Sequence, residues 1–156
     1  MRWEKCPRCQ ARIRQLGLRD KDGYTAEHYL QGYVTDRIGK YLAERGRRII
    51  GWDEILEGQA PSDAIVMSWR GSAGGIKAAK LGHDVIMTPN SHFYFDYYQS
   101  PDADAEPFGI GGCVTIDKVY SFDPMADLTP GQQAHILGVQ ANLWTEYLSL
   151  IHISEP

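Results

Sequence analysis

The chain has 156 residues, of which 43% are hydrophobic and 23% are charged, and its formal net charge is −4 at pH 7. These values are typical of a globular domain that is long enough to bury a core. The acidic balance argues against general nucleic-acid binding, and no apolar run approaches the roughly 20 residues that a membrane-spanning helix needs.

Two of the three cysteines, Cys6 and Cys9, form a Cys-x-x-Cys pair, and Cys113 is the third. The pair has the spacing of half a zinc site, but no second Cys or His pair follows it. An odd, low number of cysteines also gives no disulfide framework. We therefore expect a tight proline-containing turn or a local redox pair at residues 6–9, and no metal.

A helix with one apolar stripe is predicted after Thr25, which can serve as its N-cap. Apolar residues recur at every fourth position of this segment, namely Leu30, Val34, Ile38 and Leu42. Gly46 follows as a natural helix stop.

Four short apolar runs are predicted to be strands: residues 48–53, 64–69, 84–89 and 136–144. A glycine-rich loop and a short helix follow the second run, and a long loop leads from the third run to a helix capped by Thr129. The runs are continuously apolar, so we expect both faces of the sheet to be covered. Strands separated by helices or long connections favour a parallel α/β fold, either an open doubly wound sheet or a (β/α) barrel.

Aromatic and charged residues stand where each predicted strand ends. The four groups are Trp52-Asp53-Glu54, Trp69-Arg70, Tyr94 with Asp96, and Trp144-Thr145-Glu146. In parallel α/β folds the ligand site lies at the carboxyl ends of the strands, so these side chains should converge. An aromatic-walled pocket with a few carboxylates suits a carbohydrate, whose C–H faces pack on indole rings and whose hydroxyls donate to carboxylates.

The adjacent carboxylates of Asp53 and Glu54 could suggest an acid/base pair. Neighbouring residues on a strand point to opposite faces, so the two cannot aim at one bond without a break in the strand. We expect Trp52 to be the pocket residue of this stretch, and Asp53 and Glu54 to anchor the strand end by hydrogen bonds.

Several ordered motifs resemble one known family. GWDEIL, VMSWRG, GHDVIMTPN, YFDYYQ, KVYSFDP and ILGVQANLWTEY are similar to the second half of the catalytic barrel of family 20 glycoside hydrolases, the β-N-acetylhexosaminidases. The resemblance implies an α/β fold that is a partial (β/α)8 TIM barrel, with strands five to eight and their helices in residues 1–148. Residues 149–156 do not resemble the family, and we expect a truncated or foreign tail there.

The resemblance also implies an activity. Family members remove terminal β-linked N-acetylglucosamine or N-acetylgalactosamine with retention, and the 2-acetamido oxygen of the substrate acts as the nucleophile. No cofactor is implied. The expected substrate is an oligosaccharide or glycoconjugate, and the expected location is periplasmic or secreted.

Six residues match the site motifs of the family: Trp52, Trp69, Tyr94, Asp96, Trp144 and Glu146. By resemblance, the three tryptophans would wall the pocket, and Tyr94 would donate its hydroxyl to the acetamido oxygen. The carboxylates of Asp96 and Glu146 would accept hydrogen bonds from the outer sugar hydroxyls O4 and O6.

The catalytic motif of the family, His-x-Gly-Gly-Asp-Glu, does not occur in the sequence. RWEKCPRCQARI resembles the segment just after it, so we expect the catalytic Asp-Glu pair to lie upstream and this chain to be an inactive fragment. Two alternatives stay open: a non-catalytic carbohydrate-binding module, and another barrel hydrolase with Asp53, Glu54 or Glu146 as its acid. A half-barrel would leave two strand edges unpaired, so we also expect aggregation or dimerisation.

Overall fold

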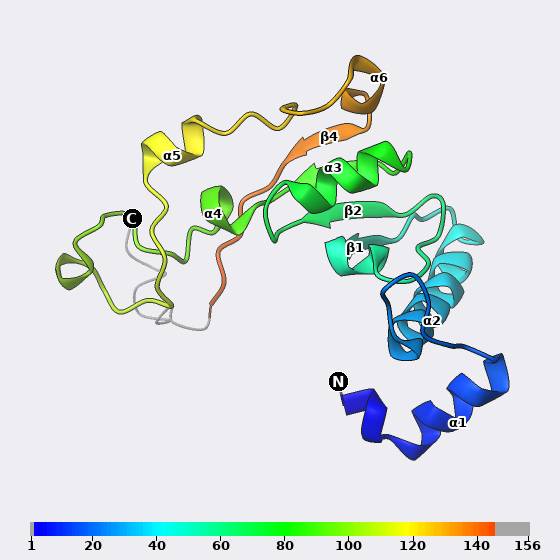
Figure 1. The fold of residues 1–156 in the computed structure, drawn as a ribbon. Coiled ribbons are helices and arrows are strands. Elements are labelled where there is room, and N and C mark those ends of the chain that lie inside the picture. Colours follow the sequence, from blue (N-terminus) through cyan, green and yellow to red (C-terminus); the bar gives the residue numbers. More distant parts are fainter. Residues whose placement is uncertain (1, 146–156) are drawn as a thin grey trace.

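One parallel sheet organises the computed structural model, which describes residues 2–145 (Figure 1). Its four strands lie in sequential order: β1 (Ile50–Trp52), β2 (Ile65–Ser68), β3 (Val85–Met87) and β4 (Ile136–Val139). All three strand pairs are parallel. The predicted α/β class and strand order are therefore confirmed, although each strand is shorter than its apolar run.

Two helices precede the sheet. A single turn, η1 (Arg2–Lys5), leads into α1 (Pro7–Leu16), and α2 (Ala26–Ala43) follows. The predicted turn at residues 6–9 is wrong: Cys6 is the N-cap of α1 and Pro7 its first residue, a position where proline is favoured because its missing N–H needs no partner there. Hydrogen bonding from the backbone and thiol of Cys9 lowers the pKa of the Cys6 thiol.

The predicted N-cap of α2 is confirmed, because the Thr25 N–H donates to Nδ1 of His28 at 3.1 Å. The apolar stripe of this helix is only partly buried: Leu30 is inside, whereas Val34 and Ile38 are exposed. The helix makes its close contact at a glycine instead, because a Cβ at Gly32 would lie 3.0 Å from the backbone of Gln59. The helix thus approaches the loop before β2 through a small residue and leaves much of its stripe to solvent.

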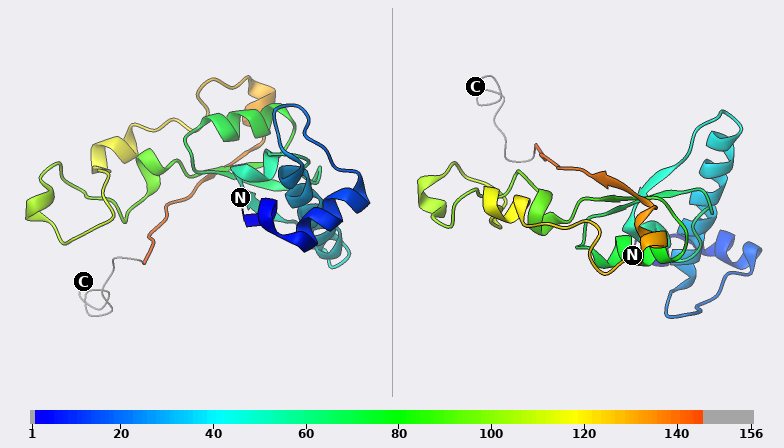
Figure 2. Two further views of the ribbon diagram at one scale, coloured as in Figure 1. Left: turned by 60° about the horizontal axis from the view of Figure 1, so that its bottom comes forward. Right: turned by 90° about the horizontal axis from the view of Figure 1, so that it is seen from above.

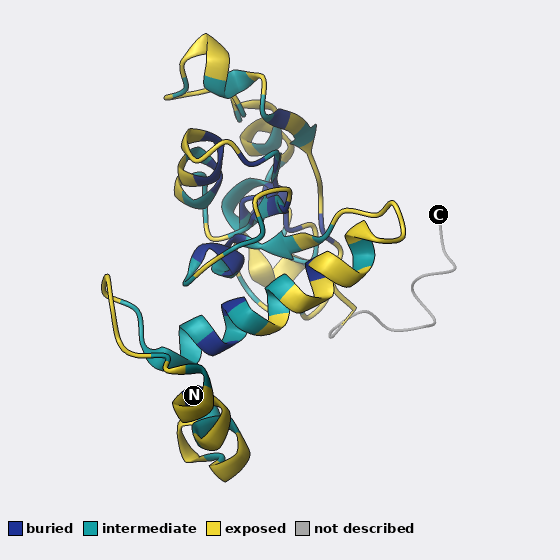
Figure 3. Cartoon of the chain, turned by 90° about the vertical axis from the view of Figure 1, so that its right-hand side faces the viewer, coloured by how far each residue is buried: buried dark blue, intermediate teal, exposed yellow. Residues whose placement is uncertain are grey.

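One face of the sheet is covered by α3 (Ala73–Lys80), as Figures 1 and 2 show. The core between them contains Ile55, Leu56, Ala64, Val66, Ala78, Ala79, Val85, Met87 and Ile136. The closest approach is at Gly75, where a Cβ would lie 2.6 Å from Sδ of Met87. Burial is concentrated around this layer, while α1 is largely exposed (Figure 3).

The opposite face of the sheet is incompletely covered. Register places Ile50, Ile65, Met67 and Ile86 on this face, and Ile50 is 50% exposed while the other three are partly exposed. The prediction that both faces are covered is therefore wrong for the residues that the structure describes. The strands are apolar on both faces, yet this face is the one that a closed barrel turns towards its interior.

A long connection joins β3 to β4 and extends away from the sheet (Figures 1 and 2). It contains four short elements: α4 (Asn90–Phe93), η3 (Ala103–Ala105), α5 (Ile116–Tyr120) and α6 (Pro130–Gln133). The predicted cap of the last helix is confirmed, because the Thr129 N–H donates to Oε1 of Gln132 at 3.0 Å. Among the described residues, no helix has the length and apolarity to cross a membrane.

Candidate functional site

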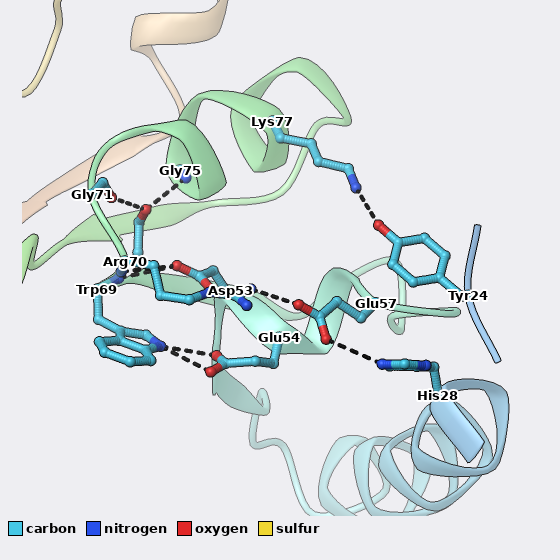
Figure 4. A network of polar contacts seen from close by, with 11 residues as sticks. Tyr24, His28, Asp53, Glu54, Glu57, Trp69, Arg70, Gly71, Gly75 and Lys77 are labelled. Atoms are coloured by element: carbon cyan, nitrogen blue, oxygen red, sulfur yellow. Dashed lines mark hydrogen bonds and ion pairs between the residues drawn. The ribbon is translucent and has the colours of Figure 1, made fainter. Parts of the chain in front are cut away.

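The first strand stops at Trp52, and the chain turns at once into η2 (Asp53–Leu56). Asp53 and Glu54 therefore lie on a turn, and the expectation that they alternate along a strand does not apply. Both side chains reach the end of β2 (Figure 4). Their predicted anchoring role is confirmed by these contacts.

Asp53 is a buried carboxylate, only 3% exposed. Its Oδ2 accepts hydrogen bonds from the backbone N–H groups of Trp69 at 3.2 Å and Arg70 at 3.3 Å. Its Oδ1 accepts from Nε of Arg70 at 2.6 Å. One side chain thus fixes the end of β2 relative to the end of β1.

The guanidinium of Arg70 extends this network to α2. Its Nη2 lies 2.7 Å from Oε1 of Glu57, and Oε2 of Glu57 lies 3.7 Å from Nε2 of His28 (Figure 4). Burial works against the charge of Arg70, but its hydrogen bonds with Glu57 and Asp53 raise its pKa. The turn after β1, the end of β2 and the first turn of α2 are therefore joined through Arg70, Glu57 and His28.

Glu54 holds the side chain of Trp69. Nε1 of the indole lies 3.1 Å and 3.0 Å from the two carboxylate oxygens of Glu54. The indole N–H is thus already bound, and the ring offers its faces for contact.

An aromatic cleft of about 220 Å³ lies at the carboxyl ends of the strands. It is lined by Trp52, Glu54, Trp69, Tyr94 and Trp144. Ring centroids are 6.0 Å apart for Trp52 and Trp144, 6.3 Å for Tyr94 and Trp144, and 6.4 Å for the stacked pair Trp69 and Tyr94. The structure therefore brings together four of the six residues that the sequence singled out.

Asn142 positions Tyr94 within this cleft. The two residues form a parallel β-bridge, in which the Phe95 N–H donates to the Asn142 carbonyl at 2.7 Å. The Asn142 side chain is also fixed, since its Nδ2 donates to Oγ1 of Thr88 at 2.9 Å. Burial raises the pKa of the Tyr94 hydroxyl, although the side chains of Trp144 and Asn142 act in the opposite direction.

The other two predicted site residues are not in the cleft lining. Oδ1 of Asp96 is the one buried side-chain polar atom in residues 2–145 that has no hydrogen-bond partner. Glu146 lies outside the described residues. Glu54 was expected among the groups at the strand ends but not among the six pocket residues, and Asn142 was not predicted as a support, because its role depends on contacts between segments that are distant in sequence.

No group of three or more His, Cys, Asp or Glu side chains in residues 2–145 is arranged to hold a metal ion. The three cysteines are free thiols. The chemistry that these residues can perform is binding: ring faces for apolar contact, one hydroxyl donor and carboxylate acceptors.

Parallel strands in sequential order, a helix on one face and a cleft at the strand ends define part of a (β/α) barrel whose site can hold a sugar-sized ligand. The sequence model of the glycosyl hydrolase family 20 catalytic domain matches residues 1–153, and the chain belongs to this family. The resemblance predicted from the motifs is thereby confirmed.

Similar proteins with an assigned activity are also β-hexosaminidases. A β-hexosaminidase from Porphyromonas gingivalis is 48% identical over 149 residues, which are 94% of this chain and 18% of that protein. A β-hexosaminidase from Vibrio furnissii is 29% identical over 150 residues, or 94% of this chain and 24% of that protein. The chain thus spans 18% to 24% of the length of these two relatives.

Solved structures give the same result. The exo-β-N-acetylglucosaminidase from Vibrio harveyi in complex with N-acetylglucosamine superposes with a TM-score of 0.77 at 28% identity, covering 94% of this chain and 22% of that one. The Flavobacterium johnsoniae chitobiase gives a TM-score of 0.69 at 29% identity, covering 92% and 20%. The predicted partial-barrel fold is confirmed.

Proposed function

We propose that the chain supplies one part of the substrate pocket of a retaining β-N-acetylhexosaminidase, which removes terminal β-linked N-acetylglucosamine or N-acetylgalactosamine. The observation that carries the proposal is the cleft: three indole rings and a phenol, each from a different strand end, surround one space. Aromatic walls of this kind pack against the C–H faces of a sugar. A related protein of known structure holds N-acetylglucosamine, which supports the choice of ligand.

In this proposal Tyr94 is the residue closest to the chemistry. A tyrosine hydroxyl is protonated at neutral pH, and burial raises the pKa of Tyr94 further, so the hydroxyl can donate to the acetamido oxygen of the substrate. A held acetamido group stays beneath the reacting carbon, and this proximity is what an internal nucleophile requires. Trp52, Trp69 and Trp144 enclose the group and support the sugar ring.

Asp96 has the property expected of a ligand acceptor. Its Oδ1 is buried without a hydrogen-bond partner among the described residues, which costs free energy, and Asp96 follows the cleft residue Tyr94 by two positions. We assign it to an outer sugar hydroxyl and assign the same role to Glu146 by its motif.

The proton donor is proposed to lie outside residues 1–156. Asp53 is buried and paired with Arg70, and both oxygens of Glu54 contact the Trp69 indole. Both carboxylates are thus engaged in holding the end of β2, and neither is free to deliver a proton to a leaving group. The structure thus supports an Asp-Glu pair supplied from elsewhere in the barrel.

The experiment is hydrolysis of a chromogenic N-acetyl-β-glucosaminide. We expect no turnover by the 156-residue chain, and measurable turnover would refute the placement of the acid. In an active enzyme that contains this chain, Tyr94→Phe should lower kcat, since the nucleophile loses its support. An effect confined to KM would contradict that role.

A non-catalytic carbohydrate-binding module is the alternative, because every group in the cleft can serve binding alone. It predicts that joining the chain to the preceding coding sequence adds no activity. Activity gained on that extension would exclude the alternative.

A further inference from the structure

Trp69 is held through both of its N–H groups by two consecutive carboxylates. Its backbone N–H donates to Asp53 at 3.2 Å, and its indole N–H lies 3.1 Å and 3.0 Å from the oxygens of Glu54. Figure 4 shows both contacts leaving the same turn, η2. The backbone and the indole ring of Trp69 are therefore both held by the turn η2.

The contact to Glu54 decides how the Trp69 ring can lie. A tryptophan side chain has two rotatable bonds, and a partly buried indole N–H loses free energy if it turns away from its only acceptor. With the N–H bound, the ring is stacked on Tyr94 with an interplanar angle of 24°. The restraint on Trp144 is of another kind: this tryptophan is 40% exposed, meets Trp52 and Tyr94 through ring contacts, and interacts with the Tyr94 hydroxyl rather than with a carboxylate.

The turn that carries Glu54 is itself restrained. The neighbouring Asp53 is paired with Arg70, and Arg70 is paired with Glu57. A Cβ at Gly74 would lie 2.7 Å from Cβ of Asp53, so α3 also packs closely against the turn η2. The backbone at Glu54 is therefore restrained, so its carboxylate cannot easily move together with a rotating Trp69 ring.

We propose that Glu54 is a positioning residue, which orients the Trp69 wall of the cleft and thereby sets how closely the sugar can pack, without exchanging a proton. The identity of the ligand rests on the proposed function, but the orienting contact does not. Trp69 contributes its face to the ligand, and its indole N–H remains with Glu54 throughout.

The competing interpretation is direct contact between Glu54 and the sugar. Glu54 lines the cleft, and a carboxylate has more lone pairs than one indole N–H occupies. The two roles differ in one respect. A positioning residue acts through Trp69, so its effect should vanish when the indole N–H is removed, whereas a direct ligand keeps its effect.

The test is a double-mutant cycle on the full chain with Glu54→Gln, Glu54→Leu and Trp69→Phe. Gln keeps an acceptor oxygen, Leu removes it, and Phe keeps a ring face without an N–H. The first readout is the indole ¹H–¹⁵N resonance of Trp69 without sugar. The second is the Kd for N-acetylglucosamine from an NMR titration.

We expect Glu54→Leu to shift the Trp69 indole resonance and to weaken binding roughly threefold to tenfold, the range of one hydrogen bond. Glu54→Gln should restore most of that loss, and Glu54→Leu should change binding less than about twofold in the Trp69→Phe background. An equal loss in both backgrounds, or an indole resonance unmoved by either Glu54 substitution, would overturn the proposal.

The two proposals fail separately. If N-acetylglucosamine does not bind to the unsubstituted chain, the proposed function is contradicted, while the sugar-free resonance still tests the orienting contact. An unchanged Trp3 resonance serves as the folding control, because Trp3 lies beside α1 in a different groove. If Glu54→Leu also shifts the Trp3 resonance, the orienting contact is tested with Glu54→Gln alone, through its effect on the Trp69 indole resonance.

Discussion

The buried carboxylate of Asp53 should be the main polar restraint on the turn that shapes the cleft. It accepts two backbone N–H groups and the Nε–H of Arg70, and it is 3% exposed. Asp53→Ala leaves these donors without their acceptor and removes the carboxylate that packs beside Gly74. The substitution should therefore lower stability and loosen Trp69 together.

The magnitude follows from the exposure of each donor. Two backbone N–H groups that lose a buried acceptor cost about 1 kcal/mol each. Arg70 is 45% exposed and keeps Glu57, so we count its loss as about 0.5–1 kcal/mol rather than the value of a fully buried pair. A total of about 2–3 kcal/mol would lower Tm by roughly 4–12 °C in a chain of this size.

The assay is thermal and urea unfolding followed by circular dichroism. Asp53→Asn keeps an acceptor oxygen and should lose about 1 kcal/mol, so the order of stability is wild type, Asn, Ala. Asp63→Ala is the matched control, because Asp63 is exposed and should change stability by less than about 0.5 kcal/mol. If Asp53→Ala behaves like this control, the network does not restrain the turn.

Three further predictions concern the rest of the molecule. Gly75→Ala should destabilise the chain by about 1–3 kcal/mol in urea unfolding, because its Cβ would lie 2.6 Å from Sδ of Met87. Asp84→Asn should cost about 0.5–1 kcal/mol near neutral pH, since Arg48 lowers the pKa of Asp84. That contribution exists above the unfolded carboxyl pKa of about 3.9 and is lost as pH falls through the lower folded value, so the two unfolding curves should merge in acid. At pH 7 the lowered pKa of Cys6 should make it the first thiol of the Cys-x-x-Cys pair that iodoacetamide alkylates, as peptide mass spectrometry can show.

Each of these has its own control. Gly131→Ala places a Cβ in open space and should be nearly neutral, so equal losses at both glycines would contradict the packing argument. A constant Asp84→Asn difference down to pH 2 would exclude an ionic origin. Equal alkylation rates of the pair would show that the hydrogen bonds at the start of α1 do not favour the Cys6 thiolate.

The sequence predicted the existence and order of the strands well, because each is an uninterrupted apolar run of strand length followed by a change of chemistry. It also located the start of α2, since Thr25 supplies its own local cap. Convergence of the aromatic residues followed from the rule that parallel strands end on one side. These features depend on local pattern or on topology, and both can be deduced from one chain.

The ends of the elements depend on distant partners and were predicted less well. β1 stops at Trp52 because Asp53 finds donors at Trp69 and Arg70, sixteen and seventeen residues away. Pairing of Asn142 with the segment around Tyr94 is equally long-range. Apolar periodicity contains no information about such contacts. The uncovered sheet face was missed for a related reason: a pattern shows that a face is apolar, not which segment covers it.

Binding of an N-acetylated sugar to the cleft can be measured directly through the four tryptophans. Trp52, Trp69 and Trp144 line the cleft, whereas Trp3 lies in another groove. In a ¹H–¹⁵N titration with N-acetylglucosamine, we expect saturable shifts of the three cleft indoles, an unmoved Trp3, and no response to glucose, which lacks the acetamido group. Shifts confined to Trp3, no shift at all, or an equal response to glucose would contradict the proposed function.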